Sequence, residues 1–358
     1  SSAASDVYKR QLRVNLSAFN PFAKKVSIDW VELKKARINL YRLEGEENFN
    51  YQFLADVFAS GEKESKVEKD TSKGKPWEIN LDKLEIAKTR FDYRDDVTGS
   101  GFNVALAQTV FRFDVFDINN QIIKASSIDI NNFAYHIRQA AIDSAQLALR
   151  DIPDTIFTET TEPDIGNDTV HISAGGWQIY AEEFNIRNSR FGMTDENVPP
   201  QEGLNFADLM LEEINIRFKN VVFLDDSISL FSEQLSARDH SGFHLENLRG
   251  NIAVTPFGIF LDSLKLEMPG SEINDRFALT FSSFNDFSNF EENVRFNVGF
   301  AETSLSTDDL AYFIPALKDV HETIQLTGRI SGPISNIKLR GFNPVSYTHL
   351  RAHETSEN

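Results

Sequence analysis

Several features that would define an enzyme, a redox protein or a nucleic-acid-binding protein are missing from this sequence. The chain of 358 residues contains no cysteine, which excludes disulfide bonds, thiolate metal sites and cysteine nucleophiles. This leaves open a reducing cytosol or an envelope protein without disulfides. Because 36 Lys and Arg stand against 54 Asp and Glu, for a net charge of −18, no nucleic-acid partner is expected. No run approaches the roughly 18 apolar residues of a membrane-spanning helix.

The motifs of common catalytic and cofactor sites are also missing. The glycines at Gly328 and Gly332 do not form the G-x-G-x-x-G pattern between a strand and a helix, and there is no serine nucleophile elbow. Acidic residues occur in pairs that fit solvated loops and helix caps better than acid–base catalysis: Asp225-Asp226, Glu291-Glu292 and Asp308-Asp309. We therefore expect no enzyme activity and no cofactor.

One pair of histidines has the spacing of a zinc site. His240 and His244 are four residues apart, as on one face of a zinc-binding helix. However, Ser241-Gly242 between them favours a turn, and no third ligand is apparent in the sequence. We expect no metal site here.

Both ends read as translations of sequencing adapters. Residues 1–11 (SSAASDVYKRQ) correspond to a transposase-type library adapter, and residues 345–355 (VSYTHLRAHET) correspond to its partner on the opposite strand. Such segments carry no information about fold or function. We expect 1–11 and 344–358 to be artefacts, and 12–343 to be a native part that is open at both ends.

Phenylalanine is unusually frequent, with 30 residues, and much of it alternates with polar or small residues. Period-two alternation places apolar side chains on one face of a strand, and a sheet with one apolar face is typical of antiparallel sheets covered on one side. We therefore expect a mainly β fold, with many strands in one elongated antiparallel sheet and a few short helices. The residues expected on the apolar face are Ile38, Leu40, Phe111, Phe113, Val115, Ile214, Ile216, Phe218, Phe277, Leu279, Phe281, Val294, Phe296, Val298 and Phe300.

A loose repeat underlies this pattern. Residues 31–40, 84–93 and 184–191 each contain a short alternating strand, a polar kink of two or three residues, and a second alternating strand. The copies are irregularly spaced, which predicts a degenerate repeat of strand–kink–strand units and not a counted solenoid.

Helices and long loops are few. The candidate helices are 48–58, 137–150 and 307–314, the last with Ser306 or Thr307 as cap, Asp308 and Asp309 in its first turn, and Pro315 as a stop. Residues 59–76 and 151–168 are polar and predict exposed loops.

Several segments resemble the TamB family of the AsmA-like superfamily. Residues 38–58, followed by a charged loop and residues 76–86, are similar to the amino-terminal half of these proteins, as are residues 241–248 and 269–273. The strongest match is residues 326–339, LTGRISGPISNIKL, which resembles the strand–turn–strand motif of the superfamily. In this motif, Gly332-Pro333 and Ser335-Asn336 would turn the chain between two strands.

The resemblance implies a curved β-groove in the periplasm of a Gram-negative cell. TamB-like proteins are anchored in the inner membrane by an amino-terminal helix and meet an outer-membrane barrel of the Omp85 type through a carboxy-terminal domain. Neither the anchor nor the carboxy-terminal domain is in this sequence, so the chain would form one part of the wall of the groove. The groove is thought to carry phospholipid acyl chains between membranes, and a role in outer-membrane protein assembly is also attached to the family.

Two functions of different classes follow. A lipid conduit predicts an unfilled apolar concave face. Exposing an acyl chain to water costs ~0.8 kcal/mol for each CH₂ group, and contact with an apolar face removes most of this cost. A structural scaffold for outer-membrane protein assembly predicts that the same apolar rows pack against each other in a closed core. Whether Phe111, Phe113, Phe277, Phe281, Phe296 and Phe300 face a groove or a core distinguishes the two.

Overall fold

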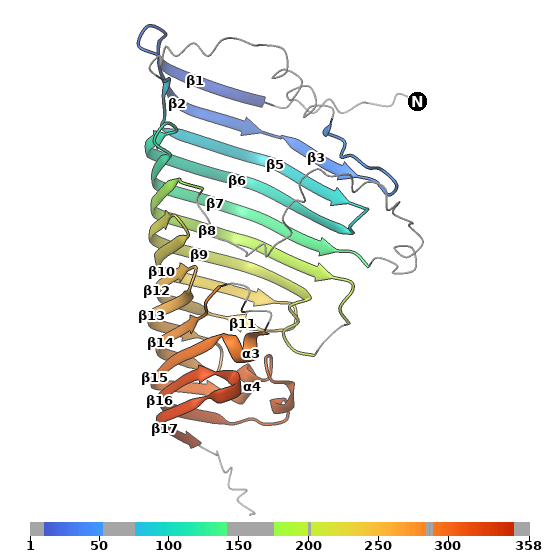
Figure 1. The fold of residues 1–358 in the computed structure, drawn as a ribbon, viewed down its shortest axis with the longest axis vertical. Helices are drawn as coiled ribbons and strands as arrows, with labels where there is room; N and C mark the ends of the chain where they lie inside the picture. The colour runs from blue at the N-terminus through green and yellow to red at the C-terminus, as the bar shows by residue number, and fades with distance from the viewer. Residues whose placement is uncertain are drawn as a thin grey trace, which may run out of the picture.

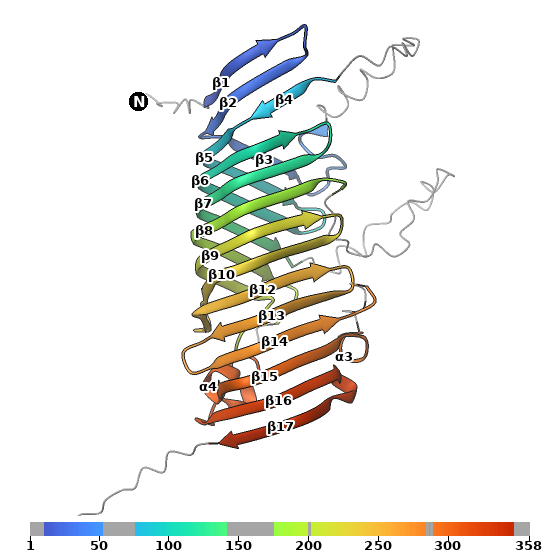
Figure 2. The ribbon, with the colours of Figure 1, turned by 90° about the vertical axis from the view of Figure 1, so that its left-hand side faces the viewer.

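The chain forms one elongated, curved sheet. The computed structural model describes residues 11–52, 76–141, 175–199, 202–283, 286 and 289–346, and these residues form a sheet of 17 strands (Figures 1 and 2). The strands are β1 (Gln11–Asn20), β2 (Lys25–Lys34), β3 (Arg37–Arg42), β4 (Glu78–Leu81), β5 (Lys83–Asp95), β6 (Ser100–Asp117), β7 (Ile122–Gln139), β8 (Gln178–Asp195), β9 (Asp208–Leu224), β10 (Ser227–Asp239), β11 (His244–Leu245), β12 (Asn247–Thr255), β13 (Gly258–Glu267), β14 (Glu272–Thr280), β15 (Arg295–Ser306), β16 (Thr323–Pro333) and β17 (Lys338–Ser346). The predicted mainly β class and single elongated sheet are confirmed.

Most strands pair with the next strand along the chain in antiparallel register. The sheet has parallel pairings at two places. At the first, β2 pairs with β4 and β5, and β3 pairs with β5; at the second, β7 pairs with β8. A parallel step needs a long connection that returns the chain to the same edge of the sheet. The chain positions of these two connections include the predicted loops 59–76 and 151–168, which lie outside the described residues apart from Pro76. The sheet is therefore mixed and not wholly antiparallel.

Helical segments are short, as expected. Those in the described part of the chain are α3 (Phe290–Asn293), α4 (Thr307–Leu310), η2 (Pro315–Leu317) and η3 (Ile334–Asn336). The predicted helix at 307–314 is one α-helical turn, and the Ser306 side chain caps it by accepting a hydrogen bond from Asp308 N. Of the other two candidate helices, 53–58 and 142–150 lie outside the described residues, and 137–139 end β7. The predicted hairpin of β16 and β17 is confirmed.

A seam of left-handed residues bends the sheet. In this seam, residues with positive φ occupy neighbouring register positions from strand to strand, although non-glycine residues rarely adopt such angles. A left-handed residue inside a strand makes a bulge, which bends the strand and re-aims the side chains after it. The predicted kinks of the repeat coincide with three of these positions, Lys35, Lys88 and Asn188. The full seam is Lys35, Lys88, Asn132, Asn188, Glu213, Gly250, Ser263, Asp275, Glu302, Gly328 and Gly341.

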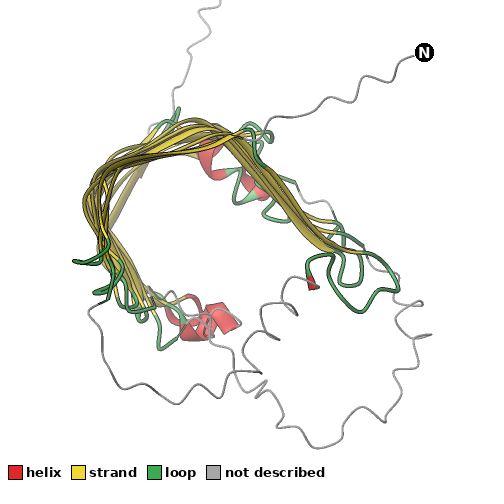
Figure 3. Cartoon of the chain, turned by 90° about the horizontal axis from the view of Figure 1, so that it is seen from above, coloured by secondary structure: helices red, strands yellow, loops and turns green. Residues whose placement is uncertain are grey.

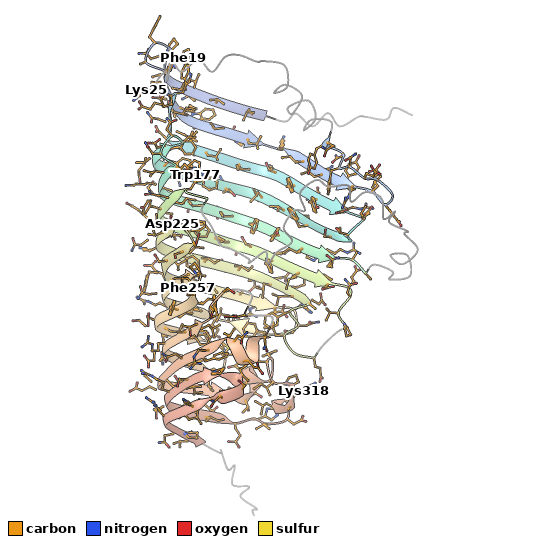
Figure 4. The ribbon with its side chains drawn as sticks, in the orientation of Figure 1. Phe19, Lys25, Trp177, Asp225, Phe257 and Lys318 are labelled. Atoms are coloured by element: carbon orange, nitrogen blue, oxygen red, sulfur yellow. The ribbon has the colours of Figure 1, made fainter. Side chains whose placement is uncertain are left out.

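The seam divides the sheet into two arms, which end in two rims. Rim A carries the turns between β1 and β2, β9 and β10, and β12 and β13, whereas rim B carries the turn between β5 and β6. Arm A and arm B are the parts of the sheet between the seam and the matching rim. Seen from above, the strands form an open curve, with the helical segments on its inner side (Figure 3). Lys25, Trp177, Asp225 and Phe257 mark rim A, and Lys318 lies at rim B (Figure 4).

Bulged positions leave backbone groups that the regular ladder does not pair, and hydroxyl side chains bind some of them. Ser189 follows Asn188, and its Oγ accepts a hydrogen bond from Phe133 N at 3.1 Å. Thr303 follows Glu302, and its Oγ1 accepts from Asn274 N at 3.1 Å. These hydroxyls replace ladder bonds at the bend, which removes the cost of a buried, unpaired N–H.

We expect Asn188→Val to lower the free energy of unfolding by about 1–2 kcal/mol, because a β-branched residue fits the left-handed region poorly. Asn188→Gly should stay close to the parent, since glycine adopts this conformation without strain. Asn103→Val, at an exposed position of β6 outside the seam, is the matched control. Urea unfolding followed by circular dichroism measures all three, and equal midpoints for Asn188→Val and Asn103→Val would contradict the role of the seam.

Candidate functional site: the concave apolar face

The inner side of the bend can be identified from burial at the seam. Thr89, Ser189 and Thr303 directly follow left-handed residues and are 8%, 1% and 0% exposed, whereas the left-handed Lys88, Asn188 and Glu302 before them are exposed. Side chains converge in the inner angle of a bend and diverge on its outer side. The three hydroxyl residues therefore point to the concave face.

Strand register extends this assignment into arm A. Ile214 pairs with Ser189, so Ile214, Ile216 and Phe218, which alternate along β9, face the concave side. Their partners across β8, β7, β6 and β5 share that face, because directly paired residues point the same way. These partners are Ile186, Phe184, Ile130, Ile128, Phe111 and Leu84.

The same argument holds in arm B and in the strands near the carboxyl end. Ser189 alternates with Phe191, and pairings run from Phe191 through Tyr135, Val104 and Phe91 to Ile38. In β5 Phe91 alternates with Tyr93, which pairs with Leu40 of β3. From Phe218, pairings lead through Ser232 of β10 to Gly250 of β12, which alternates with Ile252. Pairings then run from Ile252 through β13, β14 and β15 to β16. Predicted residues placed on the concave face along this second path are Phe277, Leu279, Phe296, Val298 and Phe300.

The upper part of the groove, β1 to β9, carries a row of aromatic rings along arm B. Ring centroids are 5.6 Å apart for Phe49 and Tyr93, 5.2 Å for Tyr93 and Phe102, 5.9 Å for Phe102 and Tyr135, and 5.9 Å for Tyr135 and Phe191. The row crosses β5, β6, β7 and β8, so it follows the long axis of the sheet. We call Tyr93, Phe102, Tyr135 and Phe191 the aromatic ladder. All four are half-buried, because they have ring neighbours beside them but retain accessible surface.

The lower part, β12 to β17, is partly closed, because three of its predicted residues are buried whereas four others are half-buried, namely Phe277, Leu279, Phe296 and Phe300. Val294 is 0% exposed, Phe281 is 7% exposed and Val298 is 9% exposed. α3 lies against η3 and β16 at rim A, and Val294 directly follows it in the chain. The predicted residues of the lower part therefore include members of a packed core, whereas those of the upper part line an apolar surface that remains half-exposed.

The face predicted for Val115 is wrong. The pairing of β6 with β7 skips Asp114, so Phe113 pairs with Ala125 but Val115 pairs with Lys124. Alternation is shifted by this bulge, and the concave position next to Phe113 is taken by Phe116, at a ring distance of 5.3 Å. Val115 consequently lies on the outer face, 37% exposed.

The aromatic ladder was not among the predicted groove residues. Its sequence signal is a change of parity: apolar residues stand at even positions before the seam in β5, as in Leu84 and Ile86, and at odd positions after it, as in Phe91 and Tyr93. A search for alternation that is allowed to slip by one residue at a polar kink would find the ladder.

One buried ion pair stabilises rim B beside the ladder. Arg42 Nε donates to Asp95 Oδ1 at 2.9 Å, and Thr98 Oγ1 and Val97 N also donate to this carboxylate. The Asp95 side chain is 4% exposed. The Arg42 guanidinium, helped by the Thr98 and Val97 hydrogen bonds, outweighs desolvation and lowers the pKa of Asp95 to about 2.

Because the pKa of Asp95 is lowered in the folded state, the free energy of unfolding should decrease at acid pH. The folded-state pKa of Asp95 lies below its unfolded value near 3.9, so its contribution is complete above about pH 4 and is lost as pH falls through about 2. We expect Asp95→Asn to lower the free energy of unfolding at pH 7 by about 2 kcal/mol and to flatten its pH dependence between about pH 4 and 2. The control Asp92→Asn removes a 41%-exposed carboxylate that lies 3.8 Å from Arg37 and should have little effect. Urea unfolding of the parent and both variants from pH 2 to 7 tests this prediction. If the free energy of unfolding of Asp95→Asn fell with pH as steeply as that of the parent, the lowered pKa of Asp95 would be contradicted.

The two histidines with zinc-site spacing can now be placed in the structure. Among the described ranges, no group of three or more His, Asp or Glu side chains could hold a metal ion. Residues 240–242 form a turn between β10 and β11, and Gly242 has a φ of 98°, so His240 and His244 do not share a helix face. Within the same described part of the chain, no helix has the length and apolar character needed to cross a membrane.

Comparison of the chain with protein-family models, curated proteins and solved structures gave no match.

Proposed function

We propose that this chain is a wall segment of a lipid-carrying protein and that its concave face binds the acyl chains of phospholipids. One observation carries the proposal: paired apolar residues of β3 to β9 line the inner face on both sides of the buried hydroxyl residues at the bend, and most of these apolar side chains remain half-exposed. A globular protein normally covers such a surface, and large exposed apolar patches mark binding sites.

The energetics suit an extended, flexible ligand. An acyl chain gains ~0.8 kcal/mol for each CH₂ removed from water, so a wall of aromatic and branched side chains binds it without any fixed polar group. Strands lie about 4.8 Å apart, so a chain that follows the ladder meets a new apolar residue at each strand. Such contacts need size and hydrophobicity only, which is consistent with a site that has no catalytic constellation.

The resemblance to the TamB family supports a wider setting for this proposal. In that setting the chain lies in the periplasm of a Gram-negative cell, with an inner-membrane anchor before it and a domain that meets an Omp85-type barrel after it. Phospholipid would pass between the inner and outer membranes along the groove, and the protein would support outer-membrane biogenesis. The proposed function requires neither enzyme activity nor a cofactor.

The buried residues of the lower part favour a second function for that section. Val294, Phe281 and Val298 are buried, as a scaffold for outer-membrane protein assembly would require of its whole apolar face. The two functions make different predictions for the upper part. A scaffold predicts that its aromatic rings are buried in a closed core, whereas a conduit predicts that they remain half-exposed.

Native mass spectrometry tests the proposal. After incubation with phosphatidylethanolamine vesicles and removal of the vesicles, the folded chain should carry bound phospholipid. A folded, β-rich chain that carries none would overturn the conduit and leave the scaffold.

A further inference from the structure

One segment is placed to control the lower part of the groove. β15 and β16 are paired neighbours, yet the chain between them makes an excursion over residues 307–320 that contains α4 and η2. We call these residues the strap. Arm B is short at this level: β13 extends beyond the seam only over residues 264–267, whereas β5 extends over residues 89–95. The strap occupies the side of the sheet on which the strands are shortened.

The base of the strap is firmly held. Asp309 is 6% exposed, and its Oδ2 accepts hydrogen bonds from Gly270 N at 2.9 Å and Ser271 Oγ at 2.7 Å. Thr307 N donates to Glu322 O at 2.9 Å, which closes the base between the two strands. Buried, charge-assisted hydrogen bonds of this kind are the strong ones, so the base stays in place.

The tip of the strap reaches back to the loops at the ends of β9 and β10. Leu204 N donates to Tyr312 O at 2.8 Å, and the rings of Tyr312 and Phe313 lie 5.9 Å and 5.5 Å from the ring of Phe243. Gly203 permits this approach, because a Cβ there would lie 2.5 Å from Tyr312 O. The strap thus spans from β15 and β16 to the upper part of the sheet.

The remaining polar tie of the tip is weak. Lys318 Nζ lies 2.8 Å from Glu202 Oε1, but the two side chains are 68% and 72% exposed, and exposed ion pairs contribute little. The tip also leaves apolar surface accessible, since Phe313 is 50% exposed and Ile314 is 49% exposed. The strap therefore combines a base held by buried hydrogen bonds with an apolar tip that is held by one backbone hydrogen bond, ring contacts with Phe243 and an exposed ion pair.

Burial changes at the level of the strap. The apolar residues of arm B near its base are buried, with Leu326 7% exposed and Met268 8% exposed. The ladder residues above it, such as Phe102 and Tyr135, are half-exposed. An acyl chain on the ladder that continued down arm B would meet the strap where Tyr312 and Phe313 cover Phe243.

We propose that the strap is a displaceable cover: its tip leaves Phe243 and the loop at 202–204 when an acyl chain extends from the ladder into the lower part of the groove. This proposal rests on the proposed function. The apolar tip and an acyl chain compete for the same surface, and the exposed ion pair of Lys318 with Glu202 adds a small part of the free energy that holds the tip in place.

The test cross-links the tip of the strap to residue 202 and measures whether lipid still reaches position 243. Because the chain has no cysteine, Glu202→Cys and Lys318→Cys together give two unique thiols at the ion pair, which a short bifunctional maleimide joins. The matched control is the same double variant treated with a monofunctional maleimide. A photoreactive benzoylphenylalanine replaces Phe243 in one protein and Phe102 in another, and phosphatidylethanolamine vesicles supply the lipid.

We expect tying the strap to reduce lipid adducts at position 243 at least about fivefold while adducts at position 102 stay unchanged. Equal adducts at position 243 in tied and control proteins would overturn the displaceable cover alone. Absence of adducts at position 102 in either protein would overturn the proposed function, and with it this proposal.

A second variant acts in the opposite direction. Lys318→Glu places two carboxylates together at the tip and should raise adducts at position 243 roughly twofold to fivefold, because like charges replace the ion pair. Lys338→Glu, the same charge change at rim A, should not alter them. A Lys318→Glu strap that gives no more adducts than Lys338→Glu would contradict the role of the ion pair.

Discussion

Phe102→Asp is expected to reduce the phospholipid bound by the chain at least tenfold. Phe102 stands in the middle of the aromatic ladder, with ring neighbours Phe91, Tyr93 and Tyr135 at 5.5, 5.2 and 5.9 Å. An acyl chain that loses contact with about two methylene groups loses roughly 1.6 kcal/mol, which is a little over tenfold in affinity. The carboxylate adds to this loss, because a charge beside an acyl chain is desolvated.

The chain offers a closely matched control for this variant. Asn103→Asp introduces the same carboxylate one residue later, at an exposed position that points to the outer face. Bound phospholipid, measured by native mass spectrometry, should be unchanged in Asn103→Asp. If both variants bind as much lipid as the parent, the ladder is not the binding surface. If both lose binding equally, the effect is one of net charge and not of the groove.

Val294→Asp is expected to destabilise the lower part of the sheet by more than about 4 kcal/mol. Val294 is 0% exposed, and an aspartate there would bury a charge without a partner. Because each strand of this long sheet contacts mainly its neighbours, the effect should be local. Amide hydrogen exchange should accelerate in β14 to β17 and remain slow in β5 to β8.

The outer face again supplies the control. Val115→Asp puts the same charge on a residue that is 37% exposed, and the free energy of unfolding should change by less than about 0.5 kcal/mol. Both valines alternate with phenylalanines in the sequence, so only the structure separates them. A Val294→Asp protein as stable as Val115→Asp would mean that the lower part is not a closed core.

Much of the fold follows from the sequence alone, because its signals are local. Alternation in segments such as 214–218 and 294–300 predicts strands with one apolar face, and that prediction is confirmed. The polar kinks at Lys35, Lys88 and Asn188 are also visible in the sequence, and they become the bends that curve the sheet.

The features that the sequence does not predict depend on partners distant in the chain. Alternation does not say which strand a neighbour pairs with, so the parallel steps at β2 and β7 were not expected. The complete burial of Val294 is not evident from alternation, and the outward turn of Val115 depends on one skipped residue in the register of β6. The ladder was missed for the related reason that its parity changes at the seam.

Site-specific photo-crosslinking is the most direct test of the central claim, that the concave face holds acyl chains. Benzoylphenylalanine is placed at Phe113 on the concave face in one protein and at the adjacent, exposed Arg112 in another, and each is illuminated with phosphatidylethanolamine vesicles. We predict phospholipid adducts at position 113 and none at position 112. Equal adducts at the two positions, or none at position 113 in a folded, β-rich protein, would contradict the claim.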